Sequence, residues 1–584
     1  MRTLLRTGSL ALLFALVASP LLIAGDEELS SLDLVSADAG VCIEIPHPGD
    51  TLNDFNASAL MGRIRALPAY QRLLQSRGFE QWHSINQHVA QQSGQPLSTQ
   101  FRALFAKSLV LAIYFPASGN PQGILIGEAA DANAVETALK TWSVLEPHDV
   151  VTTKTRQGLQ YLQRKKQSNA PDSIFVATSD RWFAISDRES LIQDVVDRFA
   201  NAKALNSATP AAPTALSPSL RRSALYIRNR QRLKADAAAY LFVNARPWDR
   251  GLEESSRDER ELVNAAAIWK HVSALSACVQ FDRGAVCDAV VELDTTRLPS
   301  GWSQWLATAT NNPALAHRFP SEAILAFSGQ LELAPLIRLV LAKVPANEIA
   351  ELTKNRRIAQ SVLGGNELFD VVLPALARDF SGFVVARKSD GTRRMVLDGT
   401  LAFTVNSLGD AKLLADVAQA LDTGLSVFAA YLSAEGQAVV TVQREQVEAS
   451  QKWWLSEQAP VPVAVGLKGQ NLMVSGSPER LQQSLDALEH PAPATRLAEY
   501  SQRYFPNANQ LIWLDLAQTR QLLDSNSTEV AQILTHGSTD DARRLANRLE
   551  QARPVLGLVD SLFIAGRVES DHIRVIFGGG LDGK

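Results

Sequence analysis

The most distinctive pattern of apolar and polar positions in the chain is a short apolar run, a polar turn and an amphipathic stretch, and it occurs twice. The first copy spans Arg181–Phe199 and the second spans Gln470–Leu488, 289 positions later. A serine, Ser186 or Ser477, stands where its side chain can cap a following helix, and Glu189 adds a capping-box spacing in the first copy. Apolar residues then recur three and four positions apart, as on one face of a helix. Each copy therefore predicts a strand, a tight turn and a capped helix.

Five other segments of the first half have counterparts in the second half, in the same order and at offsets of about 270 to 290 residues. They are the strand openings from Ser36 and Pro320, the hairpins at 108–129 and 381–403, the Asp-Ala helix starts at Asp131 and Asp410, the strands from Ala235 and Asn507, and the hairpins at 274–293 and 561–579. The hairpins predict antiparallel or mixed sheets, and the capped stretches predict amphipathic helices. The chain is therefore expected to be α+β, an internally duplicated unit with amphipathic helices packed on one face of each sheet.

This recurrence also sets the expected domain boundaries. The first α+β repeat unit is predicted at residues 32–300 and the second at 320–584, with a connector at 301–319 between them. The length agrees with such a division, because 584 residues are more than one hydrophobic core usually supports. Within the first unit, the Ala-, Pro- and Ser-rich segment Ser207–Ser219 is expected to form an exposed loop.

Residues 1–25 have the composition of a signal peptide. Arg2 and Arg6 precede an uncharged apolar run, and the small residues Ala24 and Gly25 follow that run. Cleavage after Ala24 or Gly25 would release an exported chain into the periplasm or cell envelope. The alternative is an uncleaved N-terminal anchor, because about 18 uncharged residues approach the length of a membrane span. A membrane contact is expected only in that second case.

Overall composition excludes two classes of protein. Apolar residues make up 46% of the chain and charged residues 20%, which is the balance of a folded globular protein rather than of a disordered one. The 57 Lys and Arg residues are matched by 61 Asp and Glu, so no net positive field attracts nucleic acid. No nucleic acid partner is therefore expected.

Positive charge is nevertheless concentrated in one short span, Arg221–Lys234, which holds five arginines and one lysine. They are Arg221, Arg222, Arg228, Arg230, Arg232 and Lys234. A basic helix can hold an anionic lipid or a polysaccharide. The interpretation we favour is a solvated helix face, paired with the acid-rich stretch Asp249–Glu261.

The chain has three cysteines, Cys42, Cys278 and Cys287, which are too few for a disulfide scaffold. Cys278 and Cys287 flank the turn-like stretch "FDRGA", so they can lie near one another on neighbouring strands. A disulfide between them is one interpretation, and two buried thiols are the other. Cys42 lies in an apolar strand and is expected to be a small core residue.

No catalytic, cofactor-binding or metal-binding residue is predicted. His83 and His88 are five positions apart on a predicted helix, which turns them away from one another, and the other histidines are isolated. Ser186 and Ser477 lack the flanking glycines of a nucleophile elbow, and helix capping is enough to explain them. The stretch Gly578–Lys584 has the Gly and Lys spacing of a phosphate-binding loop, but it lacks the Ser/Thr hydroxyl that such a loop needs.

Together these elements resemble an uncharacterised domain family of bacterial exported proteins of unknown function, whose repeats have a Pro-Ala-Asp-like strand opening. The similar elements are the export signal, the "ADAG" and "SEAI" strand openings, the Asp-Ala pair before a helix, and the strand-serine-helix units. The resemblance covers most of the chain and implies its fold and its location. It implies no activity, cofactor or catalytic residue.

The expected function is a non-enzymatic binding or structural role in the periplasm or cell envelope, with an envelope protein or a polysaccharide as partner. Two alternatives remain open. One is an envelope hydrolase, which requires a deep pocket with a convergent acid, base or nucleophile. The other is a lipid or glycan carrier, which requires a continuous apolar cavity between a sheet and its helices.

Overall fold

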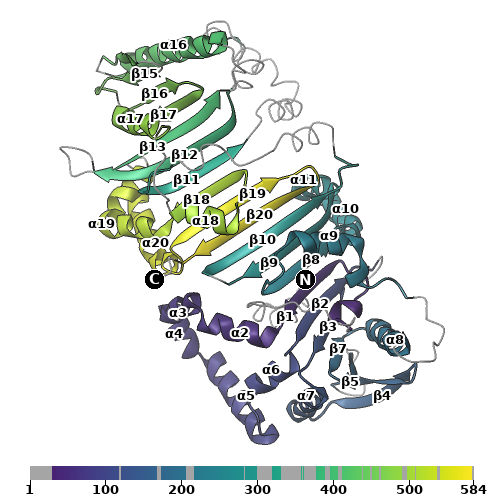
Figure 1. Ribbon diagram of the computed structural model, residues 1–584. Coiled ribbons are helices and arrows are strands. Elements are labelled where there is room, and N and C mark those ends of the chain that lie inside the picture. Colours follow the sequence, from purple (N-terminus) through teal and green to yellow (C-terminus); the bar gives the residue numbers. More distant parts are fainter. Residues whose placement is uncertain are drawn as a thin grey trace. The chain divides into compact units, whose positions relative to one another are not determined.

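The computed structural model in Figure 1 describes most of the chain between residues 29 and 581. The described residues are 29–116, 120–166, 173–205, 216–258, 260–281, 283–298, 319–330, 357, 360, 376–388, 395–405, 411–436, 439–447, 450–459, 462–489, 496–506, 508–535 and 539–581. They belong to two compact units, Met1–Arg297 with Gly580–Lys584, and Leu298–Gly579. The predicted signal peptide, and all of the predicted connector except Phe319, lie outside the described residues.

The first unit is built on antiparallel strands that pair in the order β4-β5-β6-β7-β3-β2-β1-β8-β9-β10. Their bounds are β1 Val41–Pro46, β2 Ser108–Tyr114, β3 Gln122–Glu128, β4 Val150–Arg156, β5 Leu159–Lys165, β6 Ser173–Ser179, β7 Trp182–Ser186, β8 Ala239–Asn244, β9 Val272–Gln280 and β10 Gly284–Leu293. The first strand in the chain therefore lies in the interior of the sheet, between β2 and β8.

In the second unit the strands pair in the order β14-β15-β16-β17-β13-β12-β11-β18-β19-β20. Their bounds are β11 Ala323–Gln330, β12 Leu376–Lys388, β13 Met395–Val405, β14 Val442–Val447, β15 Ser450–Leu455, β16 Ala464–Lys468, β17 Asn471–Ser475, β18 Gln510–Asp515, β19 Ser561–Val568 and β20 His572–Gly580. This is the order of the first unit with each strand number raised by ten. It is the order that an internal duplication requires, and common descent of the two units stays a prediction.

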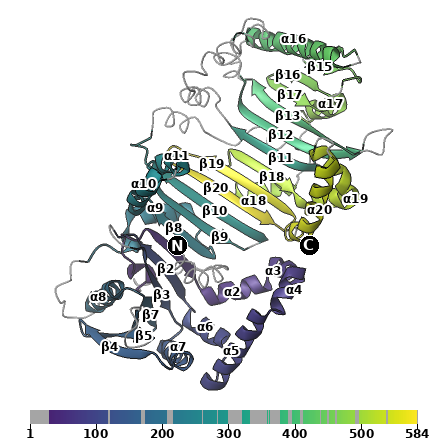
Figure 2. The ribbon, with the colours of Figure 1, turned by 180° about the vertical axis from the view of Figure 1, so that it is seen from behind.

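Among the described residues, helices stand at corresponding places after β3 and β13, after β7 and β17, and after β8 and β18 (Figures 1 and 2). In the first unit the helices are α2 Pro48–Ala57, α3 Ala59–Ala66, α4 Pro68–Leu74, α5 Arg77–Ser93, α6 Leu97–Leu104, α7 Ala132–Leu145, α8 Glu189–Leu205, α9 Ala224–Arg232, α10 Asp249–Asp258 and α11 Arg260–Trp269. In the second they are α16 Ala411–Glu435, α17 Pro478–Asp486, α18 Arg496–Tyr504, α19 Leu516–Leu534 and α20 Thr539–Leu556. The predicted α+β class is confirmed, with antiparallel sheets.

The main core of the first unit lies between α8 and the sheet. Ile124 and Ile126 of β3 are 1% and 0% exposed and pack in one cluster with Ile192 of α8. Fully burying one such side chain stabilises the fold by about 1.5–3 kcal/mol. A second cluster joins Phe183 and Leu125 to α6 and α7. Because Phe183 and Leu125 alternate with Ala184 and Ile124 along their strands, helices cover both faces of this sheet.

The two strand-turn-helix copies differ in how their serines are used. Ser477 caps α17, since its hydroxyl accepts a hydrogen bond from the Arg480 amide at 3.2 Å. The capping box predicted for Ser186 is wrong, because its hydroxyl accepts from the Arg188 amide at 3.0 Å and donates to the Gly123 carbonyl, while α8 begins at Glu189. That serine ends β7 and turns the chain instead.

Cys278 and Cys287 lie on the adjacent strands β9 and β10 as free thiols. Cys278 pairs with Asp288, while Cys287 pairs with Val279. Directly opposite residues point to the same face and successive residues to opposite faces, so the two side chains point to opposite faces of the sheet. This register does not favour a disulfide between them.

Both thiols are therefore expected to react with iodoacetamide after denaturation without reductant. Burial raises the pKa of Cys278 to about 12 and that of Cys287 to about 11, so in the native protein both groups are protonated and alkylation should be slow. Mass spectrometry of the digested protein measures the labelling. A pair of unlabelled cysteines that appears only after reduction would establish the bridge instead.

Among the described residues, no helix is long and apolar enough to cross a membrane.

Candidate functional site

A pocket of about 170 Å³ lies in the second unit, between α17 and the strands β12, β13 and β17. Figures 1 and 2 show where this helix and these strands lie. Most of its wall is apolar, with a few hydroxyl groups and one arginine. The lining residues are Phe319, Pro320, Glu322, Ser381, Gly382, Phe383, Thr400, Ala402, Met473, Arg480, Gln483, Ser484, Ala487 and Leu488. An apolar cavity with a small number of polar groups is the usual form of a small-molecule site.

Strand register explains why the pocket is there. The 289-residue offset aligns Ala184 of β7 with Met473 of β17, and these residues pair with Ile126 and Ala402 respectively. The same registers give the equivalent pairs Val110 and Ser381, Ile124 and Thr400, and Ile126 and Ala402. In the first unit all three of these side chains are at most 1% exposed and fill the core. The second unit has smaller or polar side chains at these positions, which leaves space beneath the helix.

The helix changes in the same direction. At the same offset, Leu191 and Val195 of α8 correspond to Arg480 and Ser484 of α17. Val195 is 1% exposed in the apolar core of the first unit, whereas Ser484 is a buried hydroxyl at the pocket. The helix side of the pocket has therefore exchanged two apolar side chains for polar ones.

Two buried hydroxyl groups of the wall, those of Thr400 and Ser484, belong to a chain of hydrogen bonds that also includes Ser475 behind it. The Thr400 Oγ1 atom lies 2.8 Å from Ser475 Oγ and 2.8 Å from Ser484 Oγ. Thr400, Ser475 and Ser484 are 5%, 4% and 7% exposed. The chain of hydrogen bonds satisfies hydroxyls that would otherwise be costly to bury. It also orders the floor on which a ligand would rest.

Arg480 brings the only positive charge among the lining residues. The residue is 9% exposed, and its Nη1 lies 3.3 Å from Glu322 Oε1. Its Nε lies 4.0 Å from Asp398 Oδ2, beyond hydrogen-bond distance, and has no acceptor in the structure. The guanidinium carbon stands 5.9 Å from the centre of the Phe383 ring. An arginine that lines the pocket thus has a buried N–H donor without an acceptor.

Asp398 contacts the residue that caps α17, and it is the second carboxylate beside Arg480. Its Oδ2 accepts a hydrogen bond from Ser477 Oγ at 2.9 Å, and its Oδ1 accepts one from the Gly399 amide at 2.9 Å. The residue is 3% exposed. Glu322 and Asp398 together flank Arg480, so the guanidinium is already neutralised before any ligand arrives.

The lining suits binding rather than catalysis. It contains no histidine, cysteine or lysine, and its hydroxyl groups bond to one another rather than to a base. Its carboxylate, Glu322, is paired with Arg480 and has a side chain that is 54% exposed. No acid, base and nucleophile converge in this part of the described chain, and such convergence is what a hydrolytic site requires.

A second polar cluster, in the first unit, surrounds Glu44 of β1. The Tyr226 hydroxyl donates a hydrogen bond to Glu44 Oε2 at 3.1 Å, and Arg230 Nε lies 4.0 Å from the same oxygen. The space among these groups is only about 10 Å³, which is roughly the room that one water needs. Burial raises the pKa of Glu44 above its ordinary value, and Arg230 and Tyr226 offset that rise only in part. No substrate fits here.

Replacing Glu44 by Gln is expected to raise stability at pH 8. A carboxyl group whose pKa is raised by folding stabilises the protein while it is protonated, and that contribution is lost as the pH rises through the raised value. Gln resembles the protonated form and can still accept from Tyr226, so its advantage should vanish when the pH falls below about 4. Urea unfolding midpoints at pH 4 and pH 8 measure this, and an equal loss of stability at both would contradict it.

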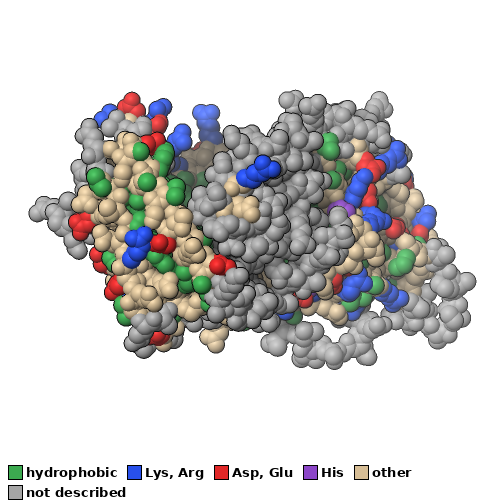
Figure 3. Space-filling model, turned by 90° about the horizontal axis from the view of Figure 1, so that it is seen from above, with side chains coloured by type: hydrophobic (Ala, Val, Ile, Leu, Met, Phe, Trp, Pro, Cys, Tyr) green, Lys and Arg blue, Asp and Glu red, His purple; other side chains and the backbone are tan. Residues whose placement is uncertain are grey.

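Several basic residues of Arg221–Lys234 contact carboxylates of the sheet or of the short helical turn Ser31–Asp33. Arg228 and Arg232 bind the two oxygens of Glu292 at 2.7 and 3.1 Å, and Arg221 lies 2.9 Å from Asp33. The predicted pairing with the stretch Asp249–Glu261 stays a prediction, because the side chains of residues 254–262 lie outside the described part of the chain. The helix α9 itself lies against β9 and β10, and β10 carries Glu292. Figure 3 shows one face of the molecule, on which Lys and Arg side chains lie among Asp and Glu side chains.

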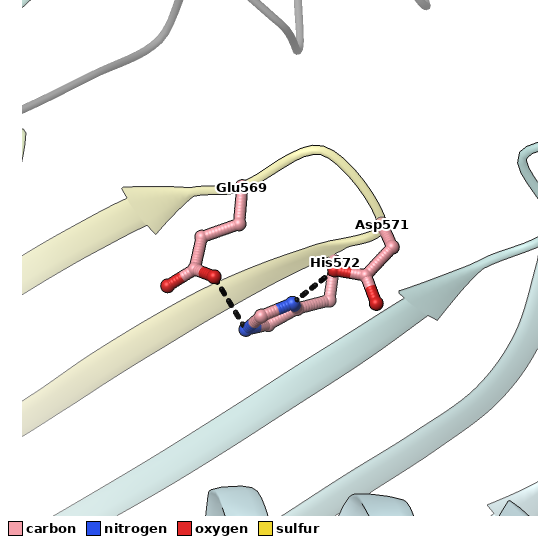
Figure 4. A group of neighbouring side chains, drawn as sticks. All are labelled: Glu569, Asp571 and His572. Carbon is pink, nitrogen blue, oxygen red and sulfur yellow. Dashed lines mark hydrogen bonds and ion pairs between the residues drawn. The ribbon is translucent and has the colours of Figure 1, made fainter.

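One histidine has acidic neighbours that the sequence reasoning did not bring together. His572 is 7% exposed, and its Nδ1 lies 2.8 Å from Asp571 Oδ1 while its Nε2 lies 3.9 Å from Glu569 Oε2 (Figure 4). The two carboxylates lie at opposite nitrogens of one ring, and Glu569 also pairs with Arg567 at 2.7 Å. One ligand atom of each of these three residues lies within 4.8 Å of the other two, close enough for a metal ion. Because Glu569 already pairs with Arg567 and the His572 ring with Asp571, we interpret the cluster as contacts that hold the β19–β20 turn together. The spacing Glu-Ser-Asp-His was the signal available in the sequence.

The other residues examined for chemistry do not converge on a site. His83 and His88 are both exposed on α5, and Cys42 is a buried free thiol. Ser186 turns the chain after β7 and Ser477 caps α17, as described above. Residues 582–584 of the glycine-rich stretch lie outside the described residues.

Comparisons with known proteins find only weak structural similarity. No protein-family model matches the chain, and no curated protein sequence matches it. Among solved structures, crystal form III of TP0453 is similar to 47% of this chain over 85% of its own, at 11% identity and a TM-score of 0.23. Crystal form I of TP0453 is similar to 48% of this chain, at 10% identity and the same TM-score. A likeness of that size supports no conclusion about function.

Proposed function

We propose that this protein is a non-enzymatic binding protein of the periplasm or cell envelope, and that its ligand is a small molecule held in the pocket beneath α17. The observation that carries the proposal is the change from apolar core to polar-lined pocket at equivalent positions of the two units. Ile126 and Ile124 fill the first unit, while Ala402 and Thr400 leave space in the second. Selection for stability alone would favour side chains that fill this volume, because close packing stabilises a core.

Two further functions receive less support from the same pocket. A hydrolase needs a nucleophile beside a base, and the lining hydroxyls have no such partner. A lipid carrier needs room for a long acyl chain, whereas an apolar cavity of about 150 Å³ holds a molecule the size of benzene. With about 170 Å³, this pocket suits a compact ligand of similar size.

Export rests on the sequence of residues 1–25, which has the basic, apolar and small-residue regions of a signal peptide. Membership of the exported family with a Pro-Ala-Asp-like strand opening is part of the same proposal. An envelope protein or a polysaccharide remains the macromolecular partner that we infer. The basic helix α9 is not the surface offered to it, because Arg228 and Arg232 already pair with Glu292.

The test is a screen of small apolar fragments by ligand-detected NMR against the full chain and against Ala402→Ile. Isoleucine at position 402 restores the side chain that the first unit has at the equivalent site, so it should fill the pocket and abolish binding. Ile126→Val, a small change in the core of the first unit, is the matched control and should bind as the unchanged protein does. Fragments that bind all three proteins alike would remove the pocket from consideration.

A further inference from the structure

We propose that the ligand of this pocket is an uncharged molecule with a compact apolar body and a carbonyl or hydroxyl oxygen that accepts a hydrogen bond from Arg480. This inference rests on the proposed function, because it names the class of ligand for the same site. It goes beyond that function by assigning a specificity-determining residue. It also predicts that anions are rejected although the wall contains an arginine.

The polar end of the ligand follows from the unpaired donor. Arg480 is 9% exposed, and its Nε has no acceptor although Nη1 faces Glu322. A buried donor without an acceptor is costly, so an acceptor supplied by a ligand is favoured. The first unit has Leu191 at the equivalent position and therefore no such donor.

The absence of charge on the ligand follows from the neighbours of the arginine. Glu322 and Asp398 lie 3.3 and 4.0 Å from guanidinium nitrogens, so two carboxylates already flank one positive charge. Asp398 is 3% exposed, which limits the screening of its charge by water. A third negative charge in this place would be repelled, whereas a neutral oxygen would not be.

The apolar body follows from the remaining wall. Phe319, Phe383, Met473 and Ala402 present apolar surface, and Leu488 closes the same space. Phe319, Met473, Phe383 and Ala402 are each at most 8% exposed. A volume of about 170 Å³ is close to that of a cavity that accepts benzene, so a ligand of roughly six to ten non-hydrogen atoms is expected.

The experiment compares three probes of similar size on the full chain, with dissociation constants from ligand-detected NMR titration. Acetophenone has a neutral acceptor, ethylbenzene has none, and benzoate has a charged one. Acetophenone is expected to bind about tenfold more tightly than ethylbenzene, because a hydrogen bond from a charged donor is worth that much or more. Benzoate is expected to bind more weakly than acetophenone.

Two variants separate the causes. In Arg480→Met, acetophenone and ethylbenzene should have about equal dissociation constants, because the donor is lost and the apolar stem is kept. Glu322→Gln changes a side chain that is 54% exposed, so it should fold normally and should improve benzoate binding at least threefold. The Ala402→Ile variant should bind none of the three probes.

Each outcome decides between the two proposals. If Ala402→Ile abolishes binding but acetophenone and ethylbenzene bind equally well, the pocket is a binding site and the role of Arg480 is wrong. If benzoate binds best to the unchanged protein, the rejection of anions is wrong. If no probe binds the unchanged protein, or if Ala402→Ile binds all three, the proposed function falls together with this inference.

Discussion

Replacing Phe563 by Ala is expected to lower the free energy of unfolding of the second unit by about 3–5 kcal/mol. Phe563 of β19 is 2% exposed. Its ring centre lies 5.9, 5.6 and 5.3 Å from those of Tyr500, Tyr504 and Phe505, which belong to α18 and the residue after it. Truncation removes the apolar contacts and the aromatic pairs at once, and the three remaining rings cannot collapse into the space without moving α18.

Ile564→Ala is the matched control, because Ile564 is the next residue on β19 but is 50% exposed on the other face. It should cost about 1 kcal/mol or less. Hydrogen exchange, followed by mass spectrometry on peptides of β18, β19 and α18, measures the loss locally, which suits a chain with two units. Equal loss of protection in the two variants would show that this cluster does not hold the sheet and helix together.

Local patterns in the sequence predicted the order of elements well. The apolar run before Ser186 became β7, and the amphipathic stretch after it became α8, because strand and helix periodicities depend on neighbours within a few residues. The second copy likewise gave β17 and α17. The hairpins predicted at 108–129 and 381–403 are β2–β3 and β12–β13. The α+β class followed from these local features alone.

Features that depend on distant partners were not predicted. In the basic span, Arg228 pairs with Glu292 and Arg230 with Glu44, both far away in sequence. Such pairs depend on which strands the helix covers, and hydrophobic periodicity does not report that.

The pocket could not be predicted from the sequence either, because it depends on how distant strands pair. Ala402 is an ordinary small strand residue until the register aligns it with Ile126 of the first unit. Only the comparison of the two sheets shows that its size leaves a cavity. The exchange of Leu191 for Arg480 was visible at the 289-residue offset, but its meaning needed the burial of Arg480 and its contacts.

Replacing Asp149 by Ala is expected to lower the free energy of unfolding of the first unit by about 3–5 kcal/mol. The Asp149 and Arg164 side chains are 9% and 3% exposed, and Arg164 Nε lies 3.3 Å from Asp149 Oδ2. Arg164 also donates to Ser143 Oγ and stands over the Trp142 ring at 4.7 Å, so the guanidinium cannot leave for water without breaking those contacts. Loss of the carboxylate leaves a buried positive charge without compensation.

A double-mutant cycle separates the cost of leaving Arg164 unpaired from the net contribution of the Asp149–Arg164 pair to stability. Arg164→Met in the Asp149→Ala background removes the uncompensated charge and keeps apolar volume beside Trp142, so the double variant should recover most of the lost stability. Glu136→Ala breaks an exposed pair with Lys140 on α7 and should leave stability almost unchanged. Urea denaturation of the unchanged protein, Asp149→Ala, Arg164→Met and the double variant supplies the coupling free energy. If the double variant is as unstable as Asp149→Ala, the destabilisation comes from lost contacts of Asp149 itself, and the explanation by an unpaired buried arginine is wrong.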